Sequence, residues 1–543
     1  METKQEKHIR IYDALKSNRS SLEAYWQTLA YYNLPRKAYI TKLKNVGAKI
    51  PTDIYDSTAI LACAYFAAGM QAYMSSPQTK WFALAIKDQN LMTKRPVLNY
   101  LRDSEDVIYG MINNSNFYQE DVESYLGLGC FGCDILYGED DVLEDIRFDC
   151  LPMENVVIVN DATGRTRTAY LEFEYNAEQA VGKFGKKAGS KVNEAYAKGD
   201  FTTMFKYLFM VRPRDVFDIS KKDAINMQYE SLWIDKETKY VVRESGFREF
   251  PFFVSRFAKS KGDPYGYSPA MNVLPDVQML NQMEHSNIVS AQNMARPPLE
   301  IPDEAFLRPF NFNPGGLNIK NAGYPNEHIT PIITGGNVPI TIQYIESKQR
   351  RIAQAFYNDL FITMEQQGNK TATEVTIMNN QRMQLLGSAV GNIMRDKLSP
   401  VIDRCYAIAA RKGKLPKLPR ELAQAEYIVQ YQSPLARAQK ALELNNLSQA
   451  MSIIAEFGAV NPSVMDKIDF DKAVDLVANI TSIAPDIIRD DGDVEEMRAM
   501  RAQQEQMTAQ MATVGQGAAM VETGTKADKN AASAQKDLAG AGK

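Results

Sequence analysis

Residues 268–298 read SPAMNVLPDVQMLNQMEHSNIVSAQNMARPP and predict one helical segment whose two ends are both marked. Ser268 and Pro269 have the residue types of an N-cap and a first helical position. After Pro275 the apolar residues recur at helical spacing, until Arg296-Pro297-Pro298 ends the pattern. We therefore expect a helix of about 30 Å. The apolar series is Val277, Leu280, Met283, Ile288, Ala291 and Met294.

A second segment of similar length, Thr341 to Phe361, carries the same kind of pattern. Its inward-facing positions are separated by 4, 3, 4 and 4 residues, whereas Glu346, Arg350 and Gln354 fall on the opposite side. The sequence therefore predicts a second helix that nearly matches the first. The inward positions are Ile345, Gln349, Ile352, Phe356 and Leu360.

The insert between these helices, residues 297–340, contains 8 Pro and 5 Gly in 44 positions. A segment this rich in proline and glycine cannot continue a helix. It is nevertheless too apolar for a disordered linker, since Phe306, Leu307, Phe310 and Phe312 all lie within seven residues. We interpret it as a small, loop-rich module carried on a stalk of two helices.

A polar loop and a very long helix follow the second stalk segment. The loop is Gln366-Gln-Gly-Asn-Lys370, and Thr371 to Glu374 has the spacing of a capping box. The pattern from Val375 to Lys412 predicts one helix, with a kink at Pro400 and a cap at Gly413. Such a helix would be about 60 Å long, which a single compact domain rarely needs.

Composition limits the functions that this chain can have. With 543 residues it is long for one core, and its net charge of −4 argues against a protein whose main task is to grip nucleic acid. No apolar run reaches the length of a membrane span. Five scattered cysteines predict free thiols in a reducing cytoplasm, and three histidines leave little material for acid–base or metal chemistry.

The rest of the chain divides into an N-terminal mixed region and a C-terminal helical one. An amphipathic helix through Ile11, Trp26 and Leu29 begins the first region. Helices and short strands alternate from there to about residue 260, and one of the helices is expected from Ala177 to Phe184. A short strand is expected from Tyr427 to Tyr431, and helical patterns dominate residues 434–511. Residues 513–543 hold hardly a large apolar side chain, so we expect them to be disordered or to order only in an assembly.

Two short motifs near residue 130 invite a functional interpretation, but their context argues against it. Gly127 to Gly132 fits G-x-G-x-x-G, yet a helix precedes it and a strand follows, the reverse of a dinucleotide site. We expect a tight helix-to-strand turn there. Cys130 and Cys133 form a lone C-x-x-C without the further ligands that zinc needs, so we expect packed thiols and no metal.

The acidic run Glu139, Asp140, Asp141, Glu144, Asp145 is interpreted as a solvated edge rather than a metal or catalytic cluster. The sequence contains no G-x-S-x-G elbow and no G-x-x-x-x-G-K-[ST] phosphate loop. The second absence distinguishes the chain from a DNA-translocating ATPase. We therefore expect neither catalytic residues nor a cofactor.

The order of several motifs resembles the head-to-tail connector, or portal, proteins of short-tailed bacteriophages, over roughly residues 1–510. The motifs are Gly262-Asp-Pro-Tyr-Gly-Tyr-Ser-Pro269, the helix end at Pro297-Pro298, Asn313-Pro-Gly-Gly316, Thr371-Ala-Thr-Glu-Val375 and Ser433-Pro-Leu-Ala-Arg-Ala-Gln439.

The resemblance implies an α+β fold in the form of an elongated portal-type subunit. It assigns a mixed α/β wing, a two-helix stem, a loop-rich clip, a long kinked helix and a helical crown. The expected boundaries are 1–265 for the wing, 266–296 for stem helix 1, 297–340 for the clip, 341–362 for stem helix 2, 363–413 for the channel loop and long helix, 414–512 for the crown and 513–543 for the tail.

The function that the resemblance implies is that of a non-enzymatic ring subunit, expected to be twelve-fold, at one vertex of the virion head. The ring is assembled in the host cytoplasm and passes double-stranded DNA inward during packaging and outward during ejection. Its expected partners are further copies of itself, the terminase large subunit, the major capsid and scaffolding proteins, and the tail adaptor or nozzle proteins. No membrane is involved.

The resemblance also assigns site residues. It places Gln366, Gln367, Gly368, Asn369 and Lys370 in a loop facing the DNA channel, whereas on its residues alone this loop is an ordinary helix connection. In the clip it implies a docking surface around Phe306, Arg308, Phe310 and Phe312. The charged group Glu346, Lys348, Arg350, Arg351 either faces the channel or pairs with neighbouring subunits.

Two alternatives from other classes stay open at this point. A packaging nuclease or ATPase would need a phosphate loop and an acidic metal site. A tail or adaptor protein of the virion without a channel would not need two matched helices around an insert followed by a ~60 Å rod.

Overall fold

The computed structural model describes most of residues 3–295 and several segments beyond them. The described ranges are 3–42, 53–88, 91, 94–218, 220–221, 223–295, 299–300, 330–331, 338–362, 386–422, 427–431, 444, 447–457, 470, 473–474, 477, 494–507 and 529. The chain divides into two units. The first comprises Met1–Lys87, Leu101–Leu418 and Glu426–Ala438, and the second comprises Asp88–Tyr100, Pro419–Ala425 and Gln439–Lys543.

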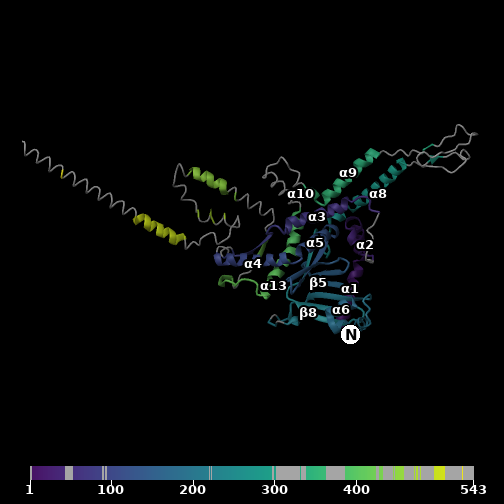
Figure 1. Cartoon of the computed structure of the whole chain (residues 1–543), viewed down its shortest axis with the longest axis horizontal. Coiled ribbons are helices and arrows are strands. Elements are labelled where there is room, and N and C mark those ends of the chain that lie inside the picture. Colours follow the sequence, from purple (N-terminus) through teal and green to yellow (C-terminus); the bar gives the residue numbers. More distant parts are fainter. Residues whose placement is uncertain are drawn as a thin grey trace, which may run out of the picture. The chain divides into compact units, whose positions relative to one another are not determined.

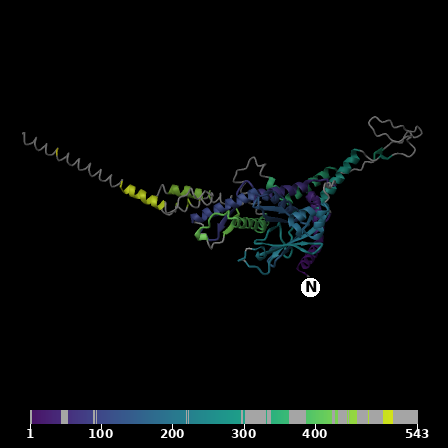
Figure 2. The ribbon, with the colours of Figure 1, turned by 60° about the horizontal axis from the view of Figure 1, so that its bottom comes forward.

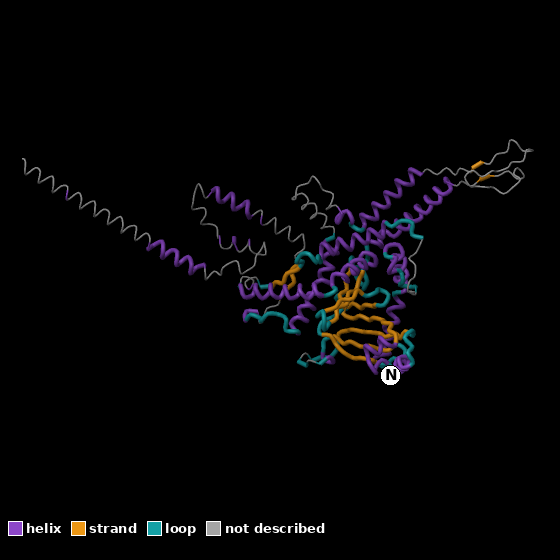
Figure 3. The backbone as a smooth tube through the Cα atoms, viewed as in Figure 1, coloured by secondary structure: helices purple, strands orange, loops and turns teal. Residues whose placement is uncertain are grey.

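In the first unit a five-stranded antiparallel sheet follows the strand order β4-β5-β6-β7-β8 (Figure 3). Apolar and polar positions do not simply alternate on it, because both of its faces are covered. The strands are β4 (Val156–Asn160), β5 (Thr166–Asn176), β6 (Met204–Pro213), β7 (Tyr229–Asp235) and β8 (Val241–Phe247).

Helix α1 (Lys4–Asn18) covers one face of this sheet. Thr3 and Glu6 form a capping box at its start, in which each side chain accepts a hydrogen bond from the other residue's backbone amide. Tyr12 of α1 is fully buried in a cluster with Leu208, Met210 and Leu232 of the sheet. This packing buries alternate residues of β6, Leu208 and Met210, which lie on the same face of the strand.

The opposite face of the sheet is aromatic. Phe173, Phe209 and Trp233 stack across neighbouring strands, with Phe209 and Trp233 ring centroids 4.4 Å apart. Tyr137 packs edge-on against Phe209. The second, three-stranded sheet therefore meets the first one there. Its strand order is β3-β2-β9, with β2 (Cys133–Asp140), β3 (Ile146–Cys150) and β9 (Phe252–Arg256).

Short helices follow β5 at the edge of the aromatic face. Helix α6 (Ala177–Phe184) has the predicted bounds, and the 3-10 turn η3 (Gly185–Ala188) and α7 (Ser190–Ala197) come after it. Lys183 of α6 lies 4.3 Å from the ring centroid of Trp233. The ammonium group therefore covers an aromatic ring that would otherwise meet water.

The amphipathic N-terminal helix predicted through Ile11, Trp26 and Leu29 is interrupted, because α1 ends at Asn18 and α2 (Ser20–Asn33) starts anew. The interruption is at Arg19, whose side chain is buried. Its guanidinium donates to Glu23 at 2.7 Å, to the Tyr265 hydroxyl at 2.9 Å and to the Val156 carbonyl. These acceptors come from three separate elements, which apolar periodicity cannot reveal.

A layer of helices lies beyond the sheets. Helix α3 (Thr58–Met74) packs against α5 (Phe117–Phe131), and α4 (Arg95–Asn114) precedes α5 in the chain. Strand β1 (Phe82–Ile86) pairs antiparallel with β12 (Tyr427–Tyr431), which has the predicted bounds. None of the helices in the described ranges has the length and apolar character to cross a bilayer.

The first stalk helix, α8 (Pro269–Ala295), starts as predicted, because the Ser268 hydroxyl accepts from the Met271 amide at 3.0 Å. It continues through Pro275 and has 27 residues, so it is about 40 Å long rather than 30 Å. Pro275 cannot donate to the Met271 carbonyl. The Tyr25 hydroxyl donates to that carbonyl instead, at 3.3 Å.

The second stalk helix, α9 (Val338–Ala355), runs beside α8 (Figures 1 and 2). It has 18 residues, so the expectation of nearly equal lengths is wrong. Tyr357 adopts a left-handed conformation, with φ of 59°, and α10 (Asn358–Ile362) follows it. The insert between the stalk helices is described only where β10 (Leu299–Glu300) pairs antiparallel with β11 (Thr330–Pro331).

Candidate functional site: the anchored long helix

The long helix predicted before Gly413 is described from Gly387 onward as three consecutive helical pieces. These are α12 (Gly387–Ile393), a π-helical turn, η5 (Met394–Leu398), and α13 (Ser399–Arg411). The Ser399 amide bonds to the Met394 carbonyl, five residues back. The kink predicted at Pro400 is therefore a widened, π-helical turn directly before the proline. A wider turn accommodates proline because its nitrogen cannot donate a hydrogen bond and its ring crowds the preceding turn.

A buried ion pair anchors this π-helical turn. The Lys397 ammonium lies 2.5 Å from the Asp121 carboxylate of α5, and neither side chain is exposed. Lys397 also donates to the Ser124 hydroxyl at 2.6 Å and lies 4.0 Å from the ring centroid of Tyr125. Ser75 donates to the other oxygen of Asp121 at 2.5 Å. Because both charges have several partners, this pair can be buried without leaving an unsatisfied ion.

Arg404 of α13 forms the second anchor, about two helical turns after Lys397. Its side chain is 2% exposed. It donates to the Gly138 carbonyl of β2 at 3.0 Å, to the Glu249 carbonyl at 3.3 Å and to the Asp140 carboxylate at 3.1 Å. Five donors in a rigid fork let one guanidinium bond to three acceptors on two segments, β2 and the loop before β9. Arg404 thus fixes α13 against strand β2 and the loop before β9.

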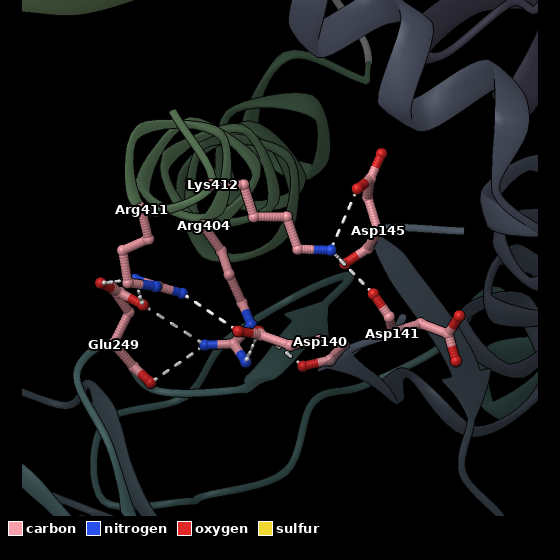
Figure 4. Close-up of polar contacts among 8 residues, drawn as sticks. Asp140, Asp141, Asp145, Glu249, Arg404, Arg411 and Lys412 are labelled. Atoms are coloured by element: carbon pink, nitrogen blue, oxygen red, sulfur yellow. Dashed lines mark hydrogen bonds and ion pairs between the residues drawn. The ribbon is translucent and has the colours of Figure 1, made fainter. Parts of the chain in front are cut away.

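The end of α13 carries an exposed ion cluster, drawn in Figure 4. Arg411 donates to Glu249 at 2.7 Å, and Lys412 and Lys414 reach Asp145 at 3.0 and 2.6 Å. Gly413 ends the helix with φ of 66°, as the sequence predicts for this glycine.

The acidic run is exposed or half-exposed, as interpreted, but two of its carboxylates also pair with cations of the long helix and the residues after it. Asp140 and Asp145 accept from arginine and lysine side chains at and after the end of α13. Asp141 instead caps its own turn, because its carboxylate accepts from the Leu143 and Glu144 amides. The cations that contact the β2–β3 hairpin lie more than 250 residues away in sequence, so sequence spacing alone could not match them to these carboxylates.

We expect Asp145→Asn to cost about 0.5–1 kcal/mol of unfolding free energy, because partly exposed ion pairs contribute little. Asparagine tolerates the left-handed backbone of this residue, whose φ is 67°. The Lys414 and Lys412 ammonium groups lower the pKa of Asp145 below 3.8. Its contribution should therefore be present above pH 3.8 and disappear as the pH falls through that lower pKa.

Urea unfolding at low and high salt measures this effect. Asp149→Asn is the matched control, since among the described residues the ion-pair partner of Asp149 is the distant, exposed Arg147, at 3.7 Å. Equal losses in both variants, or a loss for Asp145→Asn that salt does not reduce, would contradict an ionic contribution.

The charged group on α9 is partly used within the chain. Lys348 lies 2.6 Å from Asp276 of α8, and Arg351 lies 3.6 Å from the same carboxylate. Arg350 and Glu346 pair at 3.2 Å, as their four-residue spacing predicts. The Arg350 and Arg351 side chains remain 75% and 62% exposed, so these two are available to partners outside the chain.

The turn predicted over Gly127 to Gly132 is shorter than expected, because α5 continues to Phe131, whereas the two thiols are packed as predicted. Gly127 and Gly129 lie inside α5, and Gly132 makes the turn from α5 into β2 with φ of 77°. Cys130 and Cys133 are buried free thiols, and burial raises the pKa of Cys133 to about 12. Within the described ranges, no three His, Cys, Asp or Glu side chains are grouped so that they could hold a metal ion.

Other predicted site residues lie outside the described ranges. They comprise the loop Gln366, Gln367, Gly368, Asn369 and Lys370, and the clip residues Phe306, Arg308, Phe310 and Phe312. Sequence reasoning in turn missed Lys397 and Arg404. One signal was available, because these two residues share a helical stripe with Val401 and Ile408 at spacings of 4, 3 and 4. A charge on an apolar stripe needs a buried partner.

Comparison with known proteins gives one family for nearly the whole chain. The family model described as "Bacteriophage head to tail connecting protein" matches residues 5–488. The "Probable portal protein" of Bordetella phage BPP-1 is 30% identical over 515 residues, which cover 93% of this chain and 92% of the relative. The "Portal protein" of Salmonella phage epsilon15 is 27% identical over 551 residues and 99% of both chains.

Among solved structures, a chain in the "Virion of native gene transfer agent (GTA) particle" is similar at a TM-score of 0.34 and 12% identity. The match covers 78% of this chain and 89% of that one.

Proposed function

The chain belongs to the family of bacteriophage head-to-tail connecting proteins, the portal proteins, and on that premise we propose that its copies close into a ring around a DNA channel. As a portal protein it is a component of the virion. One structural observation supports the proposal most strongly. Helices α8 and α9 form a long pair, and the described residues of the insert between them pair as β10 and β11. We propose twelve copies, as the resemblance implies, and a structural rather than an enzymatic role.

In this proposal the α8–α9 pair forms the wall of the channel. Asp276 joins the two helices through Lys348 and Arg351, so the pair can act as one rigid element. Arg350 and Arg351 keep most of their surface exposed. We assign them to contacts with a neighbouring copy or with DNA phosphate, which a guanidinium suits equally.

We propose that the loop Gln366, Gln367, Gly368, Asn369, Lys370 faces the DNA. Duplex DNA carries one charge per about 1.7 Å, so short amides and one lysine per copy can touch phosphates without reading the sequence. A bidentate contact to bases is worth about 1–3 kcal/mol, and a ring of such contacts would stall translocation. Weak contact is therefore the property that a conduit needs.

The anchors of the long helix support this assignment, because they fix its C-terminal half to the wing. Lys397 and Arg404 join the helix to α5 and β2 through buried groups. A force on the preceding loop from moving DNA would then pass to the wing. We propose further that the clip, with Phe306, Arg308, Phe310 and Phe312, docks the terminase large subunit and later the tail adaptor or nozzle proteins, and that the ring meets the capsid and scaffolding proteins.

Negative-stain imaging with a mass measurement in solution tests the ring. We expect particles with a central hole and a mass near twelve times 61.0 kDa. Rings without a continuous axial opening would favour a tail or adaptor protein instead. Monomers or dimers that persist at high concentration, also with scaffolding and capsid proteins present, would refute the proposal.

A further inference from the structure

A cavity of about 360 Å³ lies where the long helix passes the two sheets. The β4–β5 turn, strand β9, the π-helical turn and the start of α13 all contribute to its lining. Four of its residues are arginines: Arg165, Arg167, Arg256 and Arg395. Four guanidinium groups around one small cavity would repel one another, so their charges need compensation.

The chain compensates only part of that charge. Arg167 pairs with Asp161 at 3.2 Å, and Arg395 donates to Asp396 at 3.2 Å. Arg165, in contrast, has no partner for its side chain among the residues that the structure describes. It is exposed, and it stands at the rim of the cavity.

The fourth arginine, Arg256, is 3% exposed and incompletely bonded. Its Nη2 donates to the Asn160 amide oxygen at 2.8 Å and the Thr166 hydroxyl at 2.5 Å, and its Nη1 donates to the Gly164 carbonyl at 3.4 Å. Its Nε has no hydrogen-bond partner in the described part of the chain. An unsatisfied buried donor on a charged group is costly, so the guanidinium of Arg256 is only partly compensated within the fold.

The carboxylates in the lining do not fill this role. Asp396 is held by Lys259 and Arg395, and Asp403 also has an interaction partner. The lining therefore contains four guanidiniums against two engaged carboxylates. Phe250, Phe252 and Val254 form an apolar wall beside them.

We propose that this cavity is a binding site for a phosphate-type oxyanion, held by Arg165 and Arg395 at the rim with Arg256 at the base. Guanidinium groups bind phosphate oxygens through two parallel hydrogen bonds, which suits this ligand better than a cation or a neutral molecule. The volume is at the lower end of small-ligand pockets and exceeds what one free anion needs. The apolar wall therefore also admits the body of a phosphate ester, such as a nucleoside monophosphate.

The bound anion would connect two parts of the fold. Arg165 belongs to the turn before β5, whereas Arg395 belongs to the π-helical turn that is also held by Lys397. A ligand that contacts both would fix the long helix more firmly to the wing, and the melting temperature should rise with the logarithm of ligand concentration once that concentration exceeds Kd. This inference concerns each copy by itself and does not depend on the ring.

Isothermal titration calorimetry on the purified full chain, at constant ionic strength, tests the site with inorganic phosphate and with AMP as probes. We expect saturable binding and a matching rise in melting temperature. The double variant Arg165→Gln/Arg395→Gln should weaken binding at least tenfold. The matched control Arg243→Gln/Arg248→Gln removes two exposed arginines outside the cavity and should change affinity less than twofold.

Tighter binding of AMP would identify a phosphate ester as the ligand, and equal affinities would identify the free anion; both support the oxyanion site. Absence of saturable binding for both probes at millimolar concentration would overturn it, as would unchanged affinity in the Arg165/Arg395 variant. Circular dichroism without ligand shows whether that variant folds, and Arg165→Gln alone provides a milder second test. Ring assembly is scored separately, so failure of the site and failure of the ring are distinguishable.

Discussion

Lys397→Met should lower the free energy of unfolding by about 3–5 kcal/mol, because it leaves the Asp121 carboxylate buried without its cation. Both side chains are fully buried, and the distance between the charged groups is 2.5 Å. Methionine fills a similar volume, so packing should change little. Among the residues that the structure describes, the Ser75 hydroxyl would remain as a hydrogen-bond donor to Asp121. The loss of unfolding free energy therefore measures the cost of leaving the Asp121 carboxylate buried without a cation.

Urea unfolding of the purified chain measures this loss, and Lys80→Met is the matched control. Lys80 also lies 2.5 Å from its partner, Asp106, but both side chains are about half exposed. We expect the control to lose at most about 1 kcal/mol. The double variant Asp121→Asn/Lys397→Met should recover part of the stability, since it leaves no buried charge. If Lys397→Met and Lys80→Met were equally mild, burial would not govern the effect.

The sequence predicted local structure well wherever local chemistry determines it. Helix α6 has the predicted bounds, and its capping box joins Asn176 to Gln179. Ser268 begins α8 for the same reason, and Gly413 ends α13, because each makes its hydrogen bonds or adopts its conformation within a few residues. Strand β12 was likewise recognised from its run of β-branched and aromatic residues.

The errors occurred where distant residues determine the structure. Strand β3 was missed because the acidic run before it was interpreted as a solvated edge, whereas the hairpin is held by Lys412 and Lys414. The break at Arg19 depends on acceptors from β4 and from Tyr265, 246 residues away. A buried cation can be suspected from an apolar helical stripe, but its partner cannot be named from spacing.

In the candidate site, too, local pairings were predicted and pairings between distant residues were missed. The four-residue spacing of Glu346 and Arg350 correctly predicted their pairing. Nothing local connects Lys348 with Asp276, which lies 72 residues earlier on the other stalk helix. The anchors Lys397 and Arg404 were missed because each contacts residues more than 260 positions away. Their contacts are apparent only in the three-dimensional structure.

Gly132→Ala should destabilise the fold by about 3 kcal/mol or more, because two costs coincide at this residue. Gly132 has φ of 77°, a conformation that costs an L-residue about 1–2 kcal/mol. A Cβ atom would also lie 2.5 Å from the Tyr267 carbonyl carbon and 2.7 Å from the Ser268 amide nitrogen. Both are backbone atoms, so no side chain can rotate away to make room.

This close approach joins the turn after α5 to the start of the first stalk helix. The Ser268 hydroxyl donates to the Cys130 carbonyl and caps α8, and the Phe257 amide donates to the Gly132 carbonyl at 3.0 Å. Moving the turn by even a fraction of an ångström therefore disturbs the base of α8. We expect faster amide hydrogen exchange in the first turns of α8 in Gly132→Ala, together with fewer rings in negative-stain images.

Gly164→Ala separates the two costs, since Gly164 has φ of 79° but no atom lies within 4 Å of the position that its Cβ would take. That variant should lose only the conformational part, about 1–2 kcal/mol, and should assemble normally. The difference between the two unfolding free energies then measures the steric contact at the base of α8. If the two variants were equally stable, Gly132 would be required only for its backbone conformation, and the turn would not position the stalk helix. If Gly132→Ala alone also impaired assembly, the seating of α8 on this turn would be a requirement for the ring.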